Sequence, residues 1–558
     1  MSPLRTYAPF WLLVAAQLLV VLVAPSMPAS QPGALGAGPL GSQSQGAATV
    51  PGGSGTVGGP GGLGPGGPGS DTPGGAAAGG QGGAFTASGG AGGGQSTGSA
   101  GSAKAGGKHC ITGLLEHPPC VPGWSGGANG GATSQGVTAK TVRVVMYRNG
   151  ENEAVNAILR STGTYISPEN EKRMVEVVEK WVNKHYQLYG RKIDFIHVHG
   201  RCNPAPPDDS CFRSDADSIV AKYHPFAVFW DNDTNEAAFH DELARKGVIS
   251  WGGWGFTDSF NNSLRPYHYE LFMGGDTQAM ITGEWWCRRM ANRKARYAGD
   301  ADLRLKTRKV AVIYPDTTVT TPSARRLESI INHCAPGSVF DSPYSSDTST
   351  AASQSSTQTT KQKSAGVTSA LWFSDPIAPA YGTKAQASQD YHPEQVLAGS
   401  GLLDYDALAQ TYEESEWKNA FGPSDLAQNT SVNEQDAGRI WRAEHQSGSP
   451  DPNSNLLTSY ALTVAGGIQA AGPKLTPLTY EYGMLTTPGY DQWSRWHDPR
   501  LIYIKFGRGD YTGVSDIREV FYDPNKVSKT NGRRGAYVAL NGGRRYQPGQ
   551  VPRSAFRK

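Results

Sequence analysis

Hydrophobic and polar residues alternate in two different ways along the chain from about residue 136. Short runs rich in valine, isoleucine and aromatic residues are typical of buried strands, whereas apolar residues recurring every three or four positions are typical of one helix face. The first part of this region predicts strands at 141–147, 192–198, 226–230 and 248–251, and helices at 169–189, 214–222 and 236–246. Alternation at this spacing indicates right-handed β-α-β crossovers and a mainly parallel sheet covered on both faces.

The same alternation restarts near residue 277, which indicates a second α/β unit. The segment 345–360, rich in Ser, Thr and Gln, is predicted to be a mobile surface loop within it. The pattern predicts strands at 309–314, 370–373 and 395–398, and helices at 277–291, 321–333, 435–445 and 456–471. We therefore expect an α/β protein with two doubly wound parallel-sheet lobes.

The start of the chain departs from this pattern. Residues 10–24 form an apolar run behind Arg5, and small residues at 28–30 offer a cleavage site, so residues 1–30 are interpreted as a signal peptide. An uncleaved signal anchor is the alternative, with the protein tethered to the membrane. Residues 31–108 contain most of the excess glycine and almost no charge, and such a segment cannot bury enough apolar surface to order its backbone. We predict a disordered Gly/Pro/Ser/Ala linker there and an exported protein.

The six cysteines agree with export to an oxidising compartment, where an even number of cysteines indicates disulfides. Six cysteines allow fifteen pairings. We predict the sequential one, because the first two pairs then close short proline-containing loops. The predicted bonds are Cys110–Cys120, Cys202–Cys211 and Cys287–Cys334. None of these pairs has the tight spacing of a structural zinc site.

The numbers of basic and acidic residues do not indicate a polyanionic partner such as nucleic acid. The chain has 51 basic and 48 acidic residues and a formal net charge of +3. A near-neutral surface lacks the basic patch that nucleic-acid binding requires, so we expect no nucleic-acid partner. The mildly basic residues 541–558 are interpreted as a solvated tail.

Five segments occur in an order that is characteristic of one family. They are GVTAKTVRV at 136–144, the unit at 226–253 ending in ISWGG, the strand at 309–316, the helix at 456–473 ending in AAGP, and the segment 511–524 containing REVFYDP. Together they resemble type I periplasmic solute-binding proteins, specifically the branched-chain amino-acid (Leu/Ile/Val-binding-like) ABC transporter receptors. The resemblance covers about residues 136–525.

This resemblance implies two lobes joined by a hinge, with a ligand trapped between them for uptake by an ABC permease. It implies a monomeric receptor for a small molecule (an amino acid, an amide or an aromatic compound), with no cofactor, metal or catalysis. The alternative is the same fold as the tethered ligand-sensing ectodomain of a signalling system. The organisation expected is a signal peptide or anchor (1–30), a linker (31–108), lobe 1 (109–276, returning at about 420–480), lobe 2 (277–419, returning at about 481–540) and a basic tail (541–558).

The candidate ligand-binding residues follow predicted strand ends, where open parallel sheets bind ligands. The amino-acid receptors place small hydroxylic residues on the two first-lobe loops, but here these loops are acidic and aromatic. Asp233 has helix capping as its alternative role, and Trp251 and Trp254 have core packing as theirs. The candidates are Trp230, Asp231, Asp233, Thr234, Trp251, Gly252, Gly253 and Trp254 from lobe 1, and Tyr314, Ser374 and Asp375 from lobe 2.

An enzyme is the third class of function to weigh, as a secreted hydrolase with an unusual site. The sequence contains no Gly-x-Ser-x-Gly elbow, HExxH or strand-linked glycine fingerprint. His197 and His199 lie on one face of a predicted strand, but no third metal ligand is near them in sequence. Asp215 and Asp217 are interpreted as capping charges at a helix start. We therefore expect no enzymatic activity.

Overall fold

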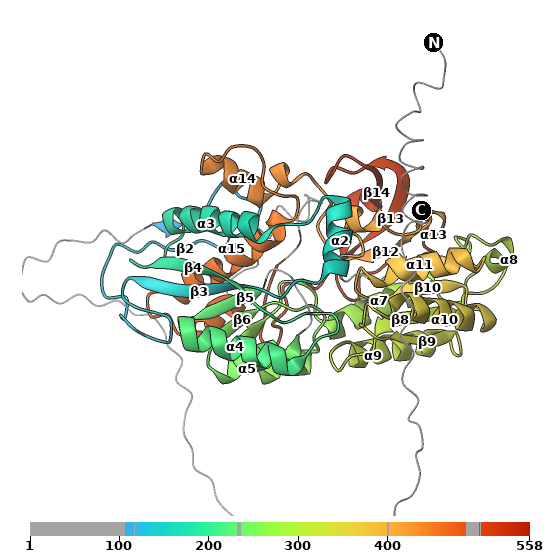
Figure 1. Ribbon diagram of the computed structural model, residues 1–558, viewed down its shortest axis with the longest axis horizontal. Coiled ribbons are helices and arrows are strands. Elements are labelled where there is room, and N and C mark those ends of the chain that lie inside the picture. The colour runs from blue at the N-terminus through green and yellow to red at the C-terminus, as the bar shows by residue number, and fades with distance from the viewer. Residues whose placement is uncertain (1–106, 117, 231–235, 399–400, 487–501, 503) are drawn as a thin grey trace, which may run out of the picture. The chain divides into compact units, whose positions relative to one another are not determined.

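The structure of the protein is a computed structural model (Figure 1). It describes residues 107–116, 118–230, 236–398, 401–486, 502 and 504–558. The predicted signal segment and nearly all of the predicted linker lie outside these residues. The described residues belong to one compact unit, which contains both lobes. A short hairpin of β1 (Lys108–His109) and β2 (Val121–Pro122) precedes lobe 1.

Lobe 1 is built on a five-stranded, fully parallel sheet in the order β4-β3-β5-β6-β7. Its strands are β3 (Thr141–Arg148), β4 (Lys192–His199), β5 (Ala227–Trp230), β6 (Ile249–Trp251) and β7 (His268–Tyr269). Its helices are α2 (Glu153–Thr162), α3 (Pro168–His185), α4 (Asp209–Tyr223), α5 (Ala237–Arg245), α6 (Asp258–Ser263), α14 (Asp436–Ala443), α15 (Ser454–Ala471) and α16 (Pro477–Thr486), with a 3₁₀ turn at Val432–Glu434.

The alternation of side chains along β3 explains why this sheet is covered on both faces. Val142 and Val144 share one hydrophobic cluster with residues of α3, α14 and α15. Val145 and Tyr147 belong to another cluster with residues of α4 and α5. Successive side chains of a strand point to opposite faces, so a strand that is apolar at almost every position must lie between two layers of helices (Figure 1).

Lobe 2 contains an eight-stranded sheet in the order β14-β13-β12-β11-β10-β8-β9, with β15 paired to β13. The neighbouring strands β9, β8, β10, β11 and β12 are parallel, and β13, β14 and β15 add an antiparallel edge. The strands are β8 (Val310–Pro315), β9 (Val339–Tyr344), β10 (Ser369–Trp372), β11 (Glu394–Leu397), β12 (Phe421–Ser424), β13 (Ile517–Val527), β14 (Arg534–Ala539) and β15 (Arg545–Tyr546). The helices are α7 (Gly275–Arg289), α8 (Ala301–Arg304), α9 (Thr320–Cys334), α10 (Ala351–Ser364), α11 (Ala378–Ser388), α12 (Asp406–Ala409) and α13 (Glu414–Trp417), with a 3₁₀ turn at Asn541–Gly543.

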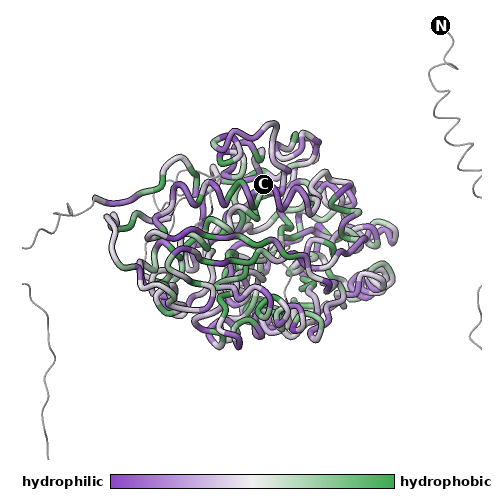
Figure 2. Tube along the Cα trace, turned by 60° about the vertical axis from the view of Figure 1, so that its left-hand side comes forward, coloured by the Kyte–Doolittle hydropathy of each residue, from purple (hydrophilic) through white to green (hydrophobic). Residues whose placement is uncertain are grey.

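The chain passes between the lobes three times. Phe272 belongs to the core of lobe 1 and Met273 to the core of lobe 2, and the chain returns to lobe 1 between Phe421 and Val432. It passes to lobe 2 for the last time between residues 511 and 514. In Figure 2 the hydrophobic segments lie mainly towards the interior and the hydrophilic ones on the outer helices and loops. Three connecting segments are a hinge of the kind that domain closure uses.

Two sequence-based expectations about segments need correction. The segment 345–360 is largely helical, because α10 begins at Ala351. The last residues are not a solvated tail, since Val551 and Phe556 are each 2% exposed and belong to the core of lobe 2. Phe556 stacks on Phe421 of β12 with ring centroids 4.7 Å apart. An aromatic residue among the terminal arginines therefore anchors the segment to lobe 2.

The predicted cysteine pairing is confirmed. Cys110–Cys120, Cys202–Cys211 and Cys287–Cys334 are bonded, and none of the described cysteines is free. The third bond joins α7 to the end of α9. The three disulfides agree with an oxidising compartment.

Candidate functional site

A cavity of about 380 Å³ lies between the two lobes. Residues at or just after strand ends line it on both sides: Arg148 ends β3, Tyr344 ends β9, and Trp254, Asp375 and Asp425 follow β6, β10 and β12. The carboxyl ends of parallel strands are where open α/β sheets bind ligands. Both sheets thus present their binding edges to the same cavity.

The lobe 1 wall contains a buried ion pair. The guanidinium of Arg148 (4% exposed) lies 3.1 Å from Glu171 Oε2 and 3.2 Å from Glu151 Oε1. The imidazole of His197 contacts the same Glu171 oxygen at 3.0 Å. Since an arginine beside two carboxylates has little unbalanced charge left, Arg148 shapes this wall more than it attracts an anion.

The lobe 2 wall is organised around Asp375. Its carboxylate accepts hydrogen bonds from the backbone N–H groups of Ile377 (2.7 Å) and Ala378 (3.1 Å) at the start of α11. The hydroxyl of Tyr344 donates to its other oxygen. These bonds hold the carboxylate in a defined position at the cavity surface, while part of it stays accessible.

Two further acids line the cavity in more buried positions. Burial raises the pKa of Glu236 to about 8, and the negative charge of Asp209 adds to this effect. Burial also raises the pKa of Asp425 well above its usual value, with Asp404 contributing in the same direction. Both carboxyl groups are therefore poorly solvated, and each would gain from a positively charged partner.

The cavity continues into lobe 2 between α10 and α11. The side chains that line this extension are neutral. The amide nitrogen of Gln362 donates to Ser342 Oγ, and that hydroxyl donates to Gln358 Oε1, both over 3.0 Å. The lining residues here are Gln354, Gln358, Gln362, Trp372, Tyr381 and Gln386. The extension lengthens the site and offers hydrogen bonds without charge.

Solved structures with the same architecture identify the fold. A solute-binding protein of an ABC transporter from Rhodopseudomonas palustris BisB5, in complex with 3,4-dihydroxybenzoic acid, is 13% identical, with a TM-score of 0.51 over 73% of this chain and 98% of that chain. A fatty acid ABC transporter substrate-binding protein from Thermomonospora curvata is 13% identical, with a TM-score of 0.52 over 77% of this chain and 99% of that chain. A possible leucine/isoleucine/valine-binding protein from Rhodopirellula baltica SH 1 is 8% identical, with a TM-score of 0.50 over 72% of this chain and 97% of that chain.

The chain has the fold of the ABC-transporter solute-binding proteins. The predicted two-lobed α/β fold is thereby confirmed. No protein-family model matches the chain, and no curated protein does. The likeness is thus one of structure alone.

Of the candidate residues, Trp254 and Asp375 line the cavity, one from each lobe. Trp254 lies in a turn that depends on glycine. Gly253 has a φ of +71°, and a Cβ atom built on it would lie 2.0 Å from the Phe256 ring. No side chain fits there, so the glycine lets the chain fold back tightly and present Trp254 to the cleft.

The structure places other candidates away from the cavity. Trp251 is fully buried in lobe 1, because β6 is covered on both faces. Tyr314 is fully buried, and its hydroxyl donates to Asp341 Oδ1 over 2.9 Å. Ser374 is 2% exposed and donates to the carbonyl of Asp375. Gly252 and Gly253 shape the turn and are not among the lining residues.

The remaining candidates belong to the first loop of lobe 1. The backbone of Trp230 ends β5. Asp231, Asp233 and Thr234 lie outside the described residues.

Sequence reasoning missed Glu236, Tyr344 and Asp425 as lining residues. Glu236 was predicted only as the first residue of the helix at 236–246. The signal that could have found Asp425 is its place directly after Phe421–Ser424, a short apolar run like the one that precedes Asp375. That strand was not predicted, because a Gly-Pro step interrupts its pattern.

The histidine and aspartate pairs weighed as catalytic or metal-binding groups have structural partners. His197 pairs with Glu171, and His199 lies 3.5 Å from Glu151. Asp215 does not cap a helix: it lies within α4, buried, and accepts a hydrogen bond from Tyr147 over 2.8 Å. Among the described residues, no group of three or more His, Cys, Asp or Glu side chains could hold a metal ion.

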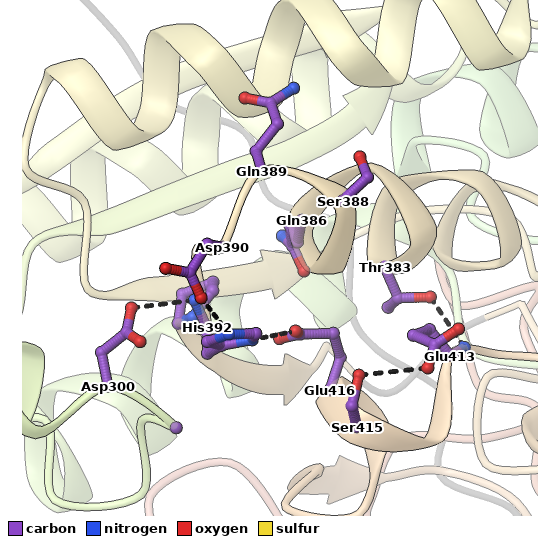
Figure 3. Close-up of polar contacts among 12 residues, drawn as sticks. Asp300, Thr383, Gln386, Ser388, Gln389, Asp390, His392, Glu413, Ser415 and Glu416 are labelled. Atoms are coloured by element: carbon purple, nitrogen blue, oxygen red, sulfur yellow. Dashed lines mark hydrogen bonds and ion pairs between the residues drawn. The ribbon is translucent and has the colours of Figure 1, made fainter.

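A second cluster of titratable groups surrounds His392 in lobe 2 (Figure 3). Its Nδ1 contacts Glu416 of α13, its Nε2 lies 3.3 Å from Asp390, and its backbone N–H donates to Asp300 over 2.9 Å. Burial lowers the pKa of His392, but the hydrogen bond and charge of Glu416 outweigh it, so the pKa is raised. The cluster joins α13 to the segments that hold Asp300 and Asp390, and none of its four residues lines the cavity described above, so we interpret it as structural.

This cluster leads to a prediction about pH. A histidine whose folded-state pKa is raised contributes stability that is fully present below its unfolded pKa and is lost as pH rises through the folded one. We expect His392→Gln to lower the free energy of unfolding by about 1.5–3 kcal/mol at pH 6, the range for a charged hydrogen bond, and by less at pH 9. Urea unfolding at both pH values measures this, and an equal loss at both would contradict a charged His392.

Proposed function

We propose that this protein is an exported receptor that captures a small organic ligand between its two lobes for uptake by an ABC permease. The observation that supports this is the shared cavity, which the carboxyl ends of both parallel sheets line within a solute-binding fold. One of the similar proteins is in complex with 3,4-dihydroxybenzoic acid and another is a fatty acid transporter substrate-binding protein, so this fold accommodates small organic molecules of different polarity.

Closure of the lobes is the mechanism that this geometry supports. A Cβ atom built on Gly401 of lobe 2 would lie 2.7 Å from the Trp254 ring and 2.6 Å from the Ser374 carbonyl. The indole of lobe 1 therefore packs directly against a loop of lobe 2, next to Asp375. A ligand held at this junction contacts both lobes and stabilises the closed form, which is the form that a permease would recognise.

The ligand is bound and released without chemical change. The described lining contains acids, aromatic residues and amides, and no described serine, cysteine or lysine in it has a base placed to activate it. Among the described residues, no helix is long and apolar enough to cross a membrane. The disulfides support a location outside the cytoplasm.

A thermal-shift screen tests the proposal, with amino acids, amides, aromatic acids, amines and sterol fragments as probes. A ligand at 100 times its dissociation constant stabilises the folded protein by about 2.7 kcal/mol, which is readily detected. Chromatography of the recovered ligand is expected to show it unchanged. Turnover of the bound compound would point to the hydrolase alternative, and stabilisation by none of these classes would contradict a receptor role.

Removing the N-terminal region is expected to leave binding intact. The described residues that line the cavity run from Arg148 to Leu457 and so come after the predicted linker in the sequence. A chain beginning at Gly107 should therefore bind a ligand found in the screen with the same dissociation constant as the full chain, within about twofold. Loss of binding on this truncation, measured by calorimetry, would show that residues 1–106 contribute to the site.

A further inference from the structure

We infer that the ligand is an organic cation, an amine or quaternary ammonium compound with an aromatic or branched apolar body. This inference rests on the proposed receptor function and specifies its ligand class. Three features of the cavity carry it: the balance of charges, the kind of polar atom left without a partner, and the aromatic side chains beside the acids.

The described lining is rich in acids and poor in bases. Arg148 is the one basic side chain, against the six acids Glu151, Glu171, Glu236, Asp347, Asp375 and Asp425. Arg148 is already paired with Glu151 and Glu171. Glu236, Asp347, Asp375 and Asp425 form no ion pair with any described residue. An anionic ligand would face these acids at short range, whereas a cation would balance them.

Three buried acceptor atoms of the described lining lack a hydrogen-bond donor. Glu171 Oε1, Gln362 Oε1 and Asp425 Oδ1 are buried in the lining and have no hydrogen-bond partner among the described residues. Asp425 is only 3% exposed, so water reaches it poorly. A buried acceptor without a donor is costly, and for a carboxylate the cost is greatest. A positive charge held in the cavity near these oxygens lowers this cost through its electrostatic attraction.

Aromatic side chains from both lobes line the cavity near Asp375. Trp254 of lobe 1 packs against Gly401 beside the Ser374 carbonyl, and Asp375 is the next residue. Tyr344 donates its hydroxyl to Asp375 itself. A cation held by a carboxylate against an aromatic face gains both the ion pair and the attraction of the ring's π electrons. The elements of an ammonium site thus come from both lobes, so the ligand itself links them.

An inorganic cation does not fit this arrangement. The acids are spread over strand ends of both lobes, and no described group of three or more can hold a metal ion. The cavity of about 380 Å³, with apolar and aromatic walls, instead fits an organic body attached to the charge. The neutral amide side chains that line the extension between α10 and α11 accommodate the uncharged end of a longer molecule.

Matched compounds separate charge from shape. Tyramine, 3-(4-hydroxyphenyl)propanoate, tyrosine and 4-ethylphenol share one ring and differ in charge, and isoamylamine, 4-methylpentanoate and leucine do the same for a branched aliphatic body. Calorimetry on the full-length protein is expected to show each amine binding at least tenfold tighter than its carboxylate partner. Zwitterions should lie between the two.

Two variants and a control complete the test. Asp375→Asn and Asp425→Asn are each expected to weaken amine binding at least tenfold and to change 4-ethylphenol binding less than twofold. Asn at position 375 still offers an oxygen to the start of α11, so this variant keeps the local fold. Asp217→Asn is the control, because Asp217 pairs with Lys246 on the surface of lobe 1 and does not line the cavity.

The possible outcomes distinguish this inference from the proposed function. Carboxylates or zwitterions that bind as tightly as the amines would overturn the cation assignment and leave the receptor function standing. Amine binding that is unchanged in both Asp variants would overturn the assignment as well. Failure of every charge class, here and in the thermal-shift screen, would instead overturn the receptor function.

Discussion

Replacing Trp254 by alanine is expected to weaken ligand binding roughly ten- to hundredfold while the protein stays folded. The indole lines the cavity from lobe 1 and packs against the Gly401 loop of lobe 2, so its removal takes away a ligand contact and a contact made on closure. Loss of an aromatic face against a ligand corresponds to about 1–3 kcal/mol, which gives this range of affinity. Isothermal calorimetry with a ligand from the screen measures the change.

The matched variant Trp254→Phe separates the two effects of Trp254. Phenylalanine keeps an aromatic face and most of the apolar area, so we expect it to recover most of the lost affinity. Trp254 is only partly buried, and thermal unfolding without ligand should change little in either variant. Full affinity in a folded Trp254→Ala protein would remove Trp254 from the site and leave the fold assignment unchanged.

Replacing Trp251 by alanine is expected to have the opposite consequence: a large loss of stability with ligand affinity preserved in the molecules that fold. Trp251 is fully buried, stacks on Tyr269 with centroids 5.1 Å apart and meets the edge of Phe506 at 5.4 Å. Its indole N–H donates to the Tyr480 hydroxyl over 2.9 Å. Truncating a buried tryptophan costs about 3–5 kcal/mol of unfolding free energy, because a cavity remains.

Urea unfolding measures this loss, and Trp251→Phe is its control. That variant keeps an aromatic ring between Tyr269 and Phe506 but leaves the Tyr480 hydroxyl without its donor, so we expect a smaller loss of about 1–3 kcal/mol. A Trp251→Ala protein with wild-type stability and weakened binding would mean that Trp251, and not Trp254, contacts the ligand. The two neighbouring tryptophans therefore test the site assignment together: replacing Trp254 should change mainly ligand affinity, and replacing Trp251 mainly stability.

The alternation of strands and helices was readable from the sequence because the central strands are buried. β3 and β8 are short runs rich in Val, with Ile or Tyr, whereas β4 alternates buried and exposed side chains, and both patterns depend only on local burial. α10 was not predicted because its buried side chains are polar. Its buried positions include Thr359 and Gln362, which face a polar part of the cavity and not an apolar core, so the helix has no hydrophobic periodicity.

The sequence by itself indicated the α/β class, the two successive units, the two short-range disulfides and the strand-end loops from which a site could come. These properties follow from hydrophobic periodicity and from short separations along the chain. Only the tertiary structure decided which loop residues reach the cavity. Trp251 and Trp254 look alike in sequence, yet residues 480 and 506, which are far away along the chain, enclose the first of them. Glu236, Asp375 and Asp425 likewise become one acidic cavity only because two separate sheets turn their carboxyl edges towards each other.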